Sequence, residues 1–160
     1  MAEFKTNVMR TLDQKKIKYI AHEYPVDDNT PIDGVSVASY IKKDAASVYK
    51  TLVCVGASKK YYVFVIPVAD QLDLKKCAKA AGEKKVEMIK QKELLPLTGY
   101  VHGGCSPIGM KKPFKTFFHS DVLSLETVTV SAGKIGYQIE VEPETLLRFV
   151  NASTAQLVAE

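Results

Sequence analysis

The sequence predicts an α+β fold in which helices surround a mixed, largely antiparallel sheet, open or closed into a barrel. The first observation is a pair of apolar segments, 48–55 and 61–66, separated by a short loop that begins at Gly56; this pattern is typical of a β-hairpin. The second is the order of the elements, because helical segments are interspersed among strands without the regular alternation of a parallel sheet. A chain of 160 residues without a linker-like segment is predicted to form a single domain, 1–160.

Two helices and a strand are predicted before this hairpin. The expected elements are a helix over 7–16, a strand over 18–24, a turn at 27–31 and a helix over 35–42. Asn7 is suited to cap the first helix, whose apolar stripe includes Val8 and Leu12. Asp33 precedes the second helix, where it can cap the first turn in the same way.

The second half of the chain is predicted to contain short strands and short helices. The expected elements are a helix over 73–81, a strand over 85–88, a helical turn at 92–95, a strand over 114–119, a helical turn beginning at 120, a hairpin of 126–131 and 137–141, and a helix beginning at 143. Leu74, Cys77 and Ala78 form the apolar face of the first of these helices, which Gly82 ends. Pro143 is suited to the first position of the last helix, where its missing N–H removes no hydrogen bond.

Composition excludes several classes of protein. No apolar run reaches the ~18–20 residues that span a bilayer, and the N-terminus lacks the apolar core of a secretory signal. Cys54, Cys77 and Cys105 occur without CxxC or metal-ligand spacing. We therefore expect free thiols in a reducing cytoplasm, and neither a metal nor another cofactor.

Positive charge is concentrated in one segment. The chain carries a net charge of +4, yet residues 75–92 contain seven lysines and two carboxylates, a local charge of +5 that leaves −1 for the remainder. Such a segment is most often a solvated helix face, and less often a surface that binds the phosphate backbone of a nucleic acid.

One residue stands out in the first strand of the hairpin. Lys50 shares a face with Val48 and Leu52, because side chains two apart point to the same side of a strand. Its ammonium group either snorkels to water past an edge or points into a polar pocket, since burial without a partner is costly. Both interpretations fit the strand taken alone. Thr51 is expected on the opposite face unless the strand bulges there.

A second unusual segment is 98–109, which contains four glycines and one proline and is therefore predicted to be irregular. Glycines allow backbone N–H groups to approach a ligand, although a tight crossover would have the same composition. The spacing is that of neither a Walker A loop nor a dinucleotide-binding loop. Cys105 and His102 could supply a nucleophile and a base, but proximity in sequence is weak evidence for such a pair. Ser106 and Pro107 are expected to form a turn.

These segments resemble, in order and spacing, those of the YbaK/EbsC family of aminoacyl-tRNA deacylases, a domain also inserted in some prolyl-tRNA synthetases. The matching segments are 48–52 (VYKTL), 67–76 (PVADQLDLKK), 84–88 (KKVEM), 98–100 (TGY), 103–109 (GGCSPIG) and 131–136 (SAGKIG). Each segment is short, but the ordered set covers most of the chain.

The resemblance implies a barrel-like α+β domain that removes a wrongly attached amino acid from tRNA in trans, most typically cysteine from tRNA(Pro). It implies catalytic roles for Lys50 and Gly103, with the thiol of the substrate attacking its own ester and leaving as a cyclic thioester. The implied partner is aminoacyl-tRNA, with prolyl-tRNA synthetase as a possible second one; no metal and no membrane are implied. Substrate-binding roles are implied for Tyr24, Thr51, Tyr100, Gly104, Ser106 and Gln138, and the lysines expected to hold the tRNA backbone are Lys75, Lys76, Lys79, Lys111 and Lys112.

Two positions depart from the family pattern. Many cysteine-specific members carry an aspartate where this chain has Gln138, and an apolar residue is usual at the position of Cys105. Other substrates therefore stay open, because relatives in the wider superfamily hydrolyse alanine or other small residues from tRNA. A module that binds tRNA or a synthetase without catalysis is a further alternative.

Overall fold

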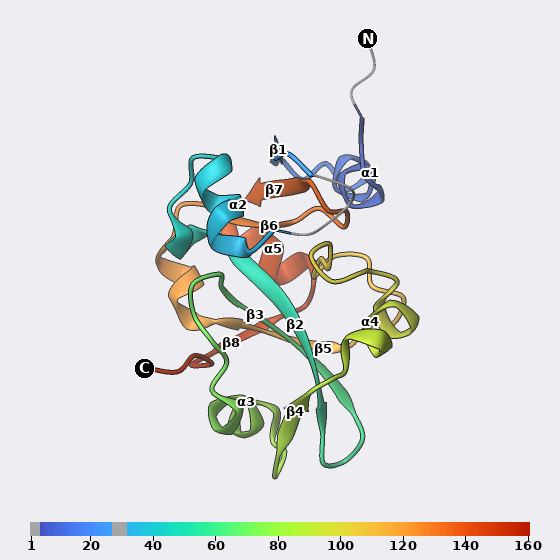
Figure 1. The fold of residues 1–160 in the computed structure, drawn as a ribbon, viewed down its shortest axis with the longest axis vertical. Helices are drawn as coiled ribbons and strands as arrows, with labels where there is room; N and C mark the ends of the chain where they lie inside the picture. Colours follow the sequence, from blue (N-terminus) through green and yellow to red (C-terminus); the bar gives the residue numbers. More distant parts are fainter. Residues whose placement is uncertain (1–3, 27–31) are drawn as a thin grey trace.

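The computed structural model describes residues 4–26 and 32–160, which form two β-sheets with helices around them (Figure 1). The strands are β1 (Ile20–Glu23), β2 (Tyr49–Gly56), β3 (Tyr61–Pro67), β4 (Val86–Met88), β5 (Lys115–His119), β6 (Val128–Ser131), β7 (Tyr137–Val141) and β8 (Ser153–Ala155). The α-helices are α1 (Asn7–Gln14), α2 (Gly34–Tyr40), α3 (Leu74–Ala81), α4 (Gln91–Thr98) and α5 (Pro143–Phe149); η1 (Ala45–Ser47) and η2 (Ser120–Ser124) are 3₁₀ helices. The turn predicted at 27–31 lies outside the described residues. Within the described ranges, no helix is long and apolar enough to cross a membrane.

The strands form two separate sheets. One has five strands in the order β4-β2-β3-β5-β8; β2 is antiparallel to β3 and β4, and β5 is parallel to β3 and β8. The other has three antiparallel strands in the order β1-β7-β6. A bridge between Val48 and Thr129 joins the two sheets. The predicted α+β class with mixed, largely antiparallel pairing is confirmed, whereas the described strands do not close into a barrel.

The β2–β3 hairpin is buried on both faces, as its two apolar strands predict. Val53 and Val65 belong to a large core cluster that also contains Ile139 of β7, so this cluster fills the space between the hairpin and the three-stranded sheet. Phe64 points to the other face and belongs to a second cluster with Cys77 of α3. Because each fully buried apolar side chain contributes about 1.5–3 kcal/mol, this hairpin is the central element of the fold.

Two predicted helix boundaries are wrong for local reasons. Thr6, not Asn7, caps α1, because the Thr6 hydroxyl accepts a hydrogen bond from the backbone N–H of Met9 at 3.2 Å. The turn expected at 92–95 is longer and continues through Pro96 as α4. Near its end the Thr98 hydroxyl donates to the carbonyl of Leu94 at 2.7 Å, so a side chain satisfies a backbone group of the last turn.

Two short elements were not predicted, η1 and β8. The β8 segment is too short and too polar to produce a strand pattern. It becomes a strand only because it pairs in parallel with β5, from Phe117 to His119. Pairing between distant segments, not local propensity, decides such edge strands.

Candidate active site

Lys50 and Thr51 are neighbours in β2 but lie on opposite faces of it. The pairing of β2 with β3 is uninterrupted, so no bulge changes the alternation of side chains. Thr51 therefore shares its face with Tyr49 and Val53, in the large core cluster. Lys50 shares its face with Val48, which packs against α2. The expectation that the two residues point to opposite sides is confirmed.

The three-stranded sheet turns a buried polar face to the side on which Lys50 lies. Thr129 of β6 is the bridge partner of Val48, and paired residues point to the same side of a sheet. Thr129 consequently faces the same side as Lys50, and the cross-strand pair Ser131–Gln138 continues that face. Its side chains are almost inaccessible to solvent: Thr129, Ser131, Gln138 and Glu140. Lys50 and Gln138 thus face one common side of the molecule.

The β6–β7 turn brings Tyr24 and the glycine-rich segment to the same end of this face. The backbone N–H of Tyr24 donates to the carbonyl of Gly136 at 3.0 Å, which extends the pairing of β1 with β7. Tyr24 is buried and follows His22 by two residues, so its side chain points to the polar side. Gly104 lies directly against the turn, since a Cβ atom at Gly104 would be 3.1 Å from the backbone nitrogen of Ile135.

Gly103 presents a backbone donor beside this turn. Its φ of 87° lies in the left-handed region that favours glycine. Gly103 is exposed, and its N–H forms no hydrogen bond within the described ranges, whereas the N–H of Gly104 donates to the carbonyl of Val101 at 3.0 Å. The loop can therefore offer the Gly103 N–H to an oxygen atom of a ligand.

Three polar groups on the Lys50 side have unused bonding capacity: the Lys50 ammonium, Oε1 of Gln138 and the Thr129 hydroxyl. The half-buried Lys50 ammonium forms neither a hydrogen bond nor an ion pair within the described part of the chain. Burial lowers the pKa of Lys50, and the negative charge of Asp70 opposes this effect. Oε1 of the buried Gln138 and the hydroxyl of the buried Thr129 likewise have no hydrogen-bond partner in residues 4–26 and 32–160. A cation and an amide oxygen on one side can together hold the polar groups of a ligand.

Three of the predicted substrate-binding residues have other surroundings. The Thr51 hydroxyl is buried on the opposite face of β2 and has no hydrogen-bond partner among the described residues. The Tyr100 hydroxyl donates to the carbonyl of Ile108, and burial raises the pKa of Tyr100 to about 12. The Ser106 hydroxyl accepts from the N–H of the same Ile108 at 3.2 Å. Tyr100 and Ser106 therefore hold the shape of the glycine-rich segment.

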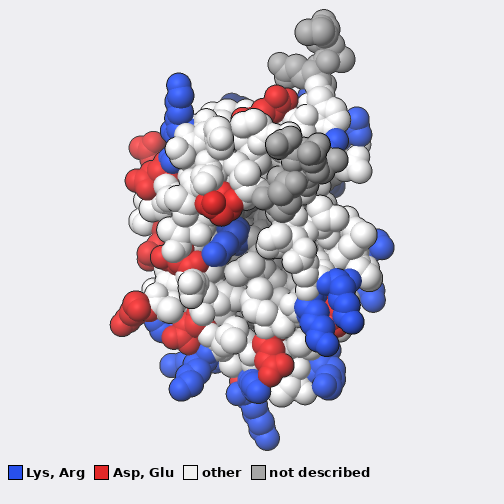
Figure 2. All heavy atoms as spheres, viewed as in Figure 1, with Lys and Arg blue, Asp and Glu red and all other residues white. Residues whose placement is uncertain are grey.

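The predicted tRNA-binding lysines fall in two places: Lys75, Lys76 and Lys79 on α3, and Lys111 and Lys112 between the glycine-rich segment and β5. Figure 1 shows α3 at the end of the molecule opposite α1. Lys76 is engaged there, since its ammonium donates to the carbonyl of Val158 at 2.9 Å. Figure 2 shows basic side chains over the lower part of the molecule, where α3, β4 and α4 lie. The structure does not bring the α3 lysines next to Lys50.

Sequence patterns did not reveal a buried ionic cluster around Glu140 on the polar face. Its carboxylate accepts hydrogen bonds from His22 Nε2 at 2.9 Å, from Lys43 Nζ at 2.7 Å and from the Thr127 hydroxyl. Burial by itself would raise the pKa of Glu140, but these hydrogen bonds outweigh it and lower the pKa to about 2. The cluster ties the segment after α2 to the three-stranded sheet.

Replacement of Glu140 by glutamine is expected to destabilise the fold by about 1–3 kcal/mol, because Lys43 loses its buried counter-charge. The folded protein binds fewer protons at Glu140 than the unfolded chain does, so this stabilisation is present above pH 4.5 and is lost as the pH falls toward 2. Urea unfolding of both proteins at pH 7 and at low pH measures the effect. Equal pH dependence of the two proteins would contradict it.

Cys105 and His102 do not form a catalytic pair. Cys105 is buried, and burial raises the pKa of its thiol to about 12, although a hydrogen bond involving Thr98 opposes the shift. His102 is exposed and forms no hydrogen bond with Cys105. All three cysteines are free thiols, as predicted.

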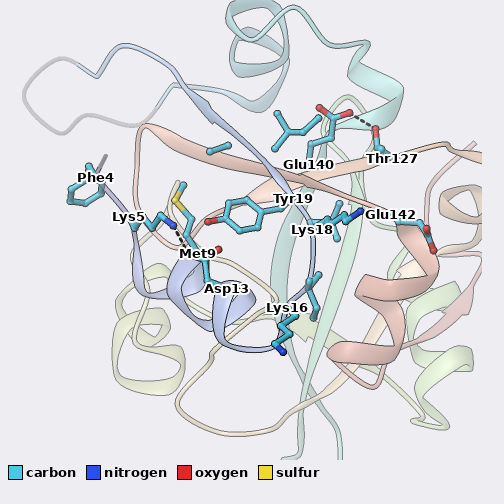
Figure 3. Close-up of a pocket in the computed structure, with 14 residues that line it drawn as sticks. Phe4, Lys5, Met9, Asp13, Lys16, Lys18, Tyr19, Thr127, Glu140 and Glu142 are labelled. Carbon is cyan, nitrogen blue, oxygen red and sulfur yellow. Dashed lines mark hydrogen bonds and ion pairs between the residues drawn. The ribbon is translucent and has the colours of Figure 1, made fainter. Parts of the chain in front are cut away.

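A pocket of about 840 Å³ beside α1 is not the candidate site. It lies between α1, residues 16–21 and the end of β7 (Figure 3). Lys50 and the glycine-rich segment do not line it. Its charged lining residues are of both signs: Lys5, Lys16, Lys18, Asp13, Glu140 and Glu142. Such a mixed surface favours no single class of charged ligand.

Comparison with known proteins establishes the family. A family model described as the aminoacyl-tRNA editing domain matches residues 33–149, which include β2, the glycine-rich segment and the β6–β7 turn. The chain belongs to the aminoacyl-tRNA editing domain family. The resemblance inferred from the sequence is confirmed, and the family relationship supports a deacylase that acts on the ester of an aminoacyl-tRNA.

Individual relatives of this editing domain support the family assignment and the fold. EbsC of Enterococcus faecalis is 43% identical over 156 residues, which cover 98% of this chain and 94% of EbsC; its name proposes a Cys-tRNA(Pro)/Cys-tRNA(Cys) deacylase. A solved structure described as a candidate trans-editing enzyme for prolyl-tRNA synthetase matches with a TM-score of 0.82 and 23% identity, over 99% of this chain and all of that one. Hypothetical protein APE2540 matches with a TM-score of 0.84 and 20% identity, over 95% of this chain and 99% of its own. The two structures support the fold.

Proposed function

We propose that this editing domain removes cysteine from mischarged tRNA(Pro) in trans. The observation that carries the proposal is Lys50, a half-buried ammonium group that forms no hydrogen bond or ion pair with the described residues, on the same side as Oε1 of Gln138, which has no hydrogen-bond partner among them either. The identity of 43% with EbsC over nearly the whole chain favours cysteine as the amino acid. Prolyl-tRNA synthetase is a further proposed partner, and the cytoplasm the proposed location.

In this proposal the residues of the protein position the substrate and stabilise charge. The Lys50 ammonium binds the ribose or phosphate oxygens at the 3′ end of the tRNA, and the Gly103 N–H donates to the carbonyl oxygen as negative charge develops on it. The substrate thiolate attacks its own ester carbon, the C–O bond to the ribose breaks, and the ribose oxygen leaves with a proton. A cyclic thioester and free tRNA result. Gln138 and Tyr24 line the pocket for the amino acid, while Gly104 and Ser106 maintain the shape of the glycine-rich segment.

The deciding experiment distinguishes an enzyme from a binding module. The protein is incubated with an excess of Cys-tRNA(Pro), with and without prolyl-tRNA synthetase, and ester loss is followed over many turnovers. We expect several ester bonds to be cleaved per protein molecule, above the rate without protein. Binding of tRNA without turnover in either mixture would contradict the enzyme and favour a tRNA- or synthetase-binding module.

Cys105→Ala is expected to retain deacylation within about threefold, because a thiol with a pKa of about 12 is protonated at neutral pH and is a poor nucleophile. The rate is measured on Cys-tRNA(Pro) at saturating protein, together with urea unfolding, since a buried side chain is shortened. Cys54→Ala serves as a matched control, because Cys54 is also buried but belongs to the second core cluster. A loss of about 10³-fold confined to Cys105→Ala would instead identify a protein nucleophile.

A further inference from the structure

A second pocket, of about 430 Å³, lies between the start of α1, the glycine-rich segment and the β6–β7 turn; we call it the α1 pocket. Its charged lining residues are all basic: Lys5, Arg10, Lys111 and Lys134. Lys5 is paired with Asp13 at 2.6 Å, but no ion pair within the described ranges involves the other three. Three cations without counter-charges around one hollow form a site for a polyanion.

The α1 pocket also has an aromatic wall. Phe4 is a large apolar side chain that leaves 50% of its surface exposed. Its ring lies 4.8 Å from that of Tyr137, and the Lys134 ammonium lies 4.7 Å from the centre of the Phe4 ring. Exposed aromatic rings beside cations are typical of surfaces that bind single-stranded nucleic acid, where bases stack on the rings and phosphates contact the cations.

The α1 pocket and the candidate active site share two walls. Gly104 of the glycine-rich segment packs against the backbone of Lys134 and Ile135 in the β6–β7 turn. Tyr100, earlier in the same segment, packs over Gly133 of that turn and lines the α1 pocket. A strand of RNA in the α1 pocket would therefore lie against the loop that carries Gly103.

We propose that the α1 pocket binds the single-stranded 3′ end of the tRNA, with phosphates on Arg10, Lys111 and Lys134 and a base stacked on Phe4. This inference rests on the proposed function, because it names where the RNA part of the substrate lies. It places the RNA end on a surface separate from α3. Of the lysines predicted from the sequence to hold the tRNA backbone, Lys111 lines this pocket, and the three lysines of α3 do not.

The test uses uncharged RNA, so that binding is measured without chemistry. A fluorescent acceptor-stem hairpin with a single-stranded 3′ end is titrated with wild type, Arg10→Ala, Lys134→Ala and Phe4→Ala. We expect each lost cation to weaken binding about three- to tenfold and to reduce the salt slope by about 0.7, as for one phosphate contact. Phe4→Ala should weaken binding about tenfold with little change in slope, because stacking is lost.

Arg148→Ala is the matched control, because Arg148 is the other arginine of the chain, is exposed on α5 and does not line the pocket. It should bind as wild type does, and a blunt hairpin without the 3′ extension should bind more weakly to wild type. Urea unfolding checks that each variant is folded. Arg10→Ala and Lys134→Ala proteins that bind as tightly as Arg148→Ala, or equal binding of the blunt hairpin, would overturn the inference.

A failure of this inference can be told apart from a failure of the proposed function. If the protein deacylates Cys-tRNA(Pro) but its pocket variants bind RNA as wild type does, only the inference that the α1 pocket binds RNA is overturned. If the protein binds the 3′ end through these residues but cleaves no ester, only the proposal that it is a deacylase is overturned.

Discussion

Lys50→Met is expected to reduce kcat/KM for Cys-tRNA(Pro) deacylation by about 10²-fold, because the ammonium positions the 3′ end of the tRNA and a misplaced substrate typically reacts slower by that factor. The methionine side chain keeps much of the length of lysine but carries no charge. Because no described protein group pairs with the Lys50 ammonium, its removal takes away a ligand contact rather than a structural one. Lys50→Arg should recover part of the loss, since it restores charge with a different shape.

Urea unfolding shows whether the loss of activity in Lys50→Met is caused by unfolding. Burial lowers the pKa of Lys50 in the folded protein, so the fold disfavours the charged form, and Lys50→Met should resist urea at least as well as wild type. Wild type should gain stability as the pH rises through the lowered pKa of Lys50, because the folded protein binds fewer protons there than the unfolded chain, and Lys50→Met should lack this gain. Lys60→Met, on the exposed β2–β3 loop, is the control. Full activity of Lys50→Met would remove Lys50 from the mechanism.

Replacement of cysteine by serine or alanine on the same tRNA is expected to slow ester loss by at least about 10²-fold. The substrate thiol has a pKa near 8.5, so a few per cent is thiolate at neutral pH, whereas the serine hydroxyl is hardly ionised and alanine has no nucleophile. Binding that holds the thiolate near its own ester carbon supplies the rate by proximity. The Cys105 thiol offers no substitute, because burial raises its pKa to about 12 and it is protonated at neutral pH.

The measurement compares single-turnover rates for Cys-, Ser- and Ala-tRNA(Pro) at saturating protein. The rate with Cys-tRNA should rise with pH toward the pKa of the substrate thiol, after subtraction of the reaction without protein. Equal rates for the three substrates would contradict thiol assistance and identify a hydrolytic deacylase for small residues. Many cysteine-specific relatives carry an aspartate at the position of Gln138. Gln138 would then be the first residue to test as the cause of that specificity.

Local patterns determined most of the elements. The apolar runs of β2 and β3 and the glycine-containing loop between them predict the hairpin, and Asp33 and Pro143 begin α2 and α5 as expected. These features depend on residues that are close in sequence, so a segment of a few residues is enough to predict each of them. The short strand β8 depends instead on pairing with β5 and had no such signal.

For the candidate site, the sequence by itself determined which residues are unusual, and the tertiary structure decided which of them meet. Alternation along β2 separates Lys50 from Thr51, and this follows from the period of a strand. That Lys50 and Gln138 face one side depends on the bridge between Val48 and Thr129, which joins two sheets. The contacts of Glu140 with His22 and Lys43 link residues 118 and 97 positions apart. The α1 pocket likewise gathers cations from three distant segments, because folding places side chains by packing and not by their order along the chain.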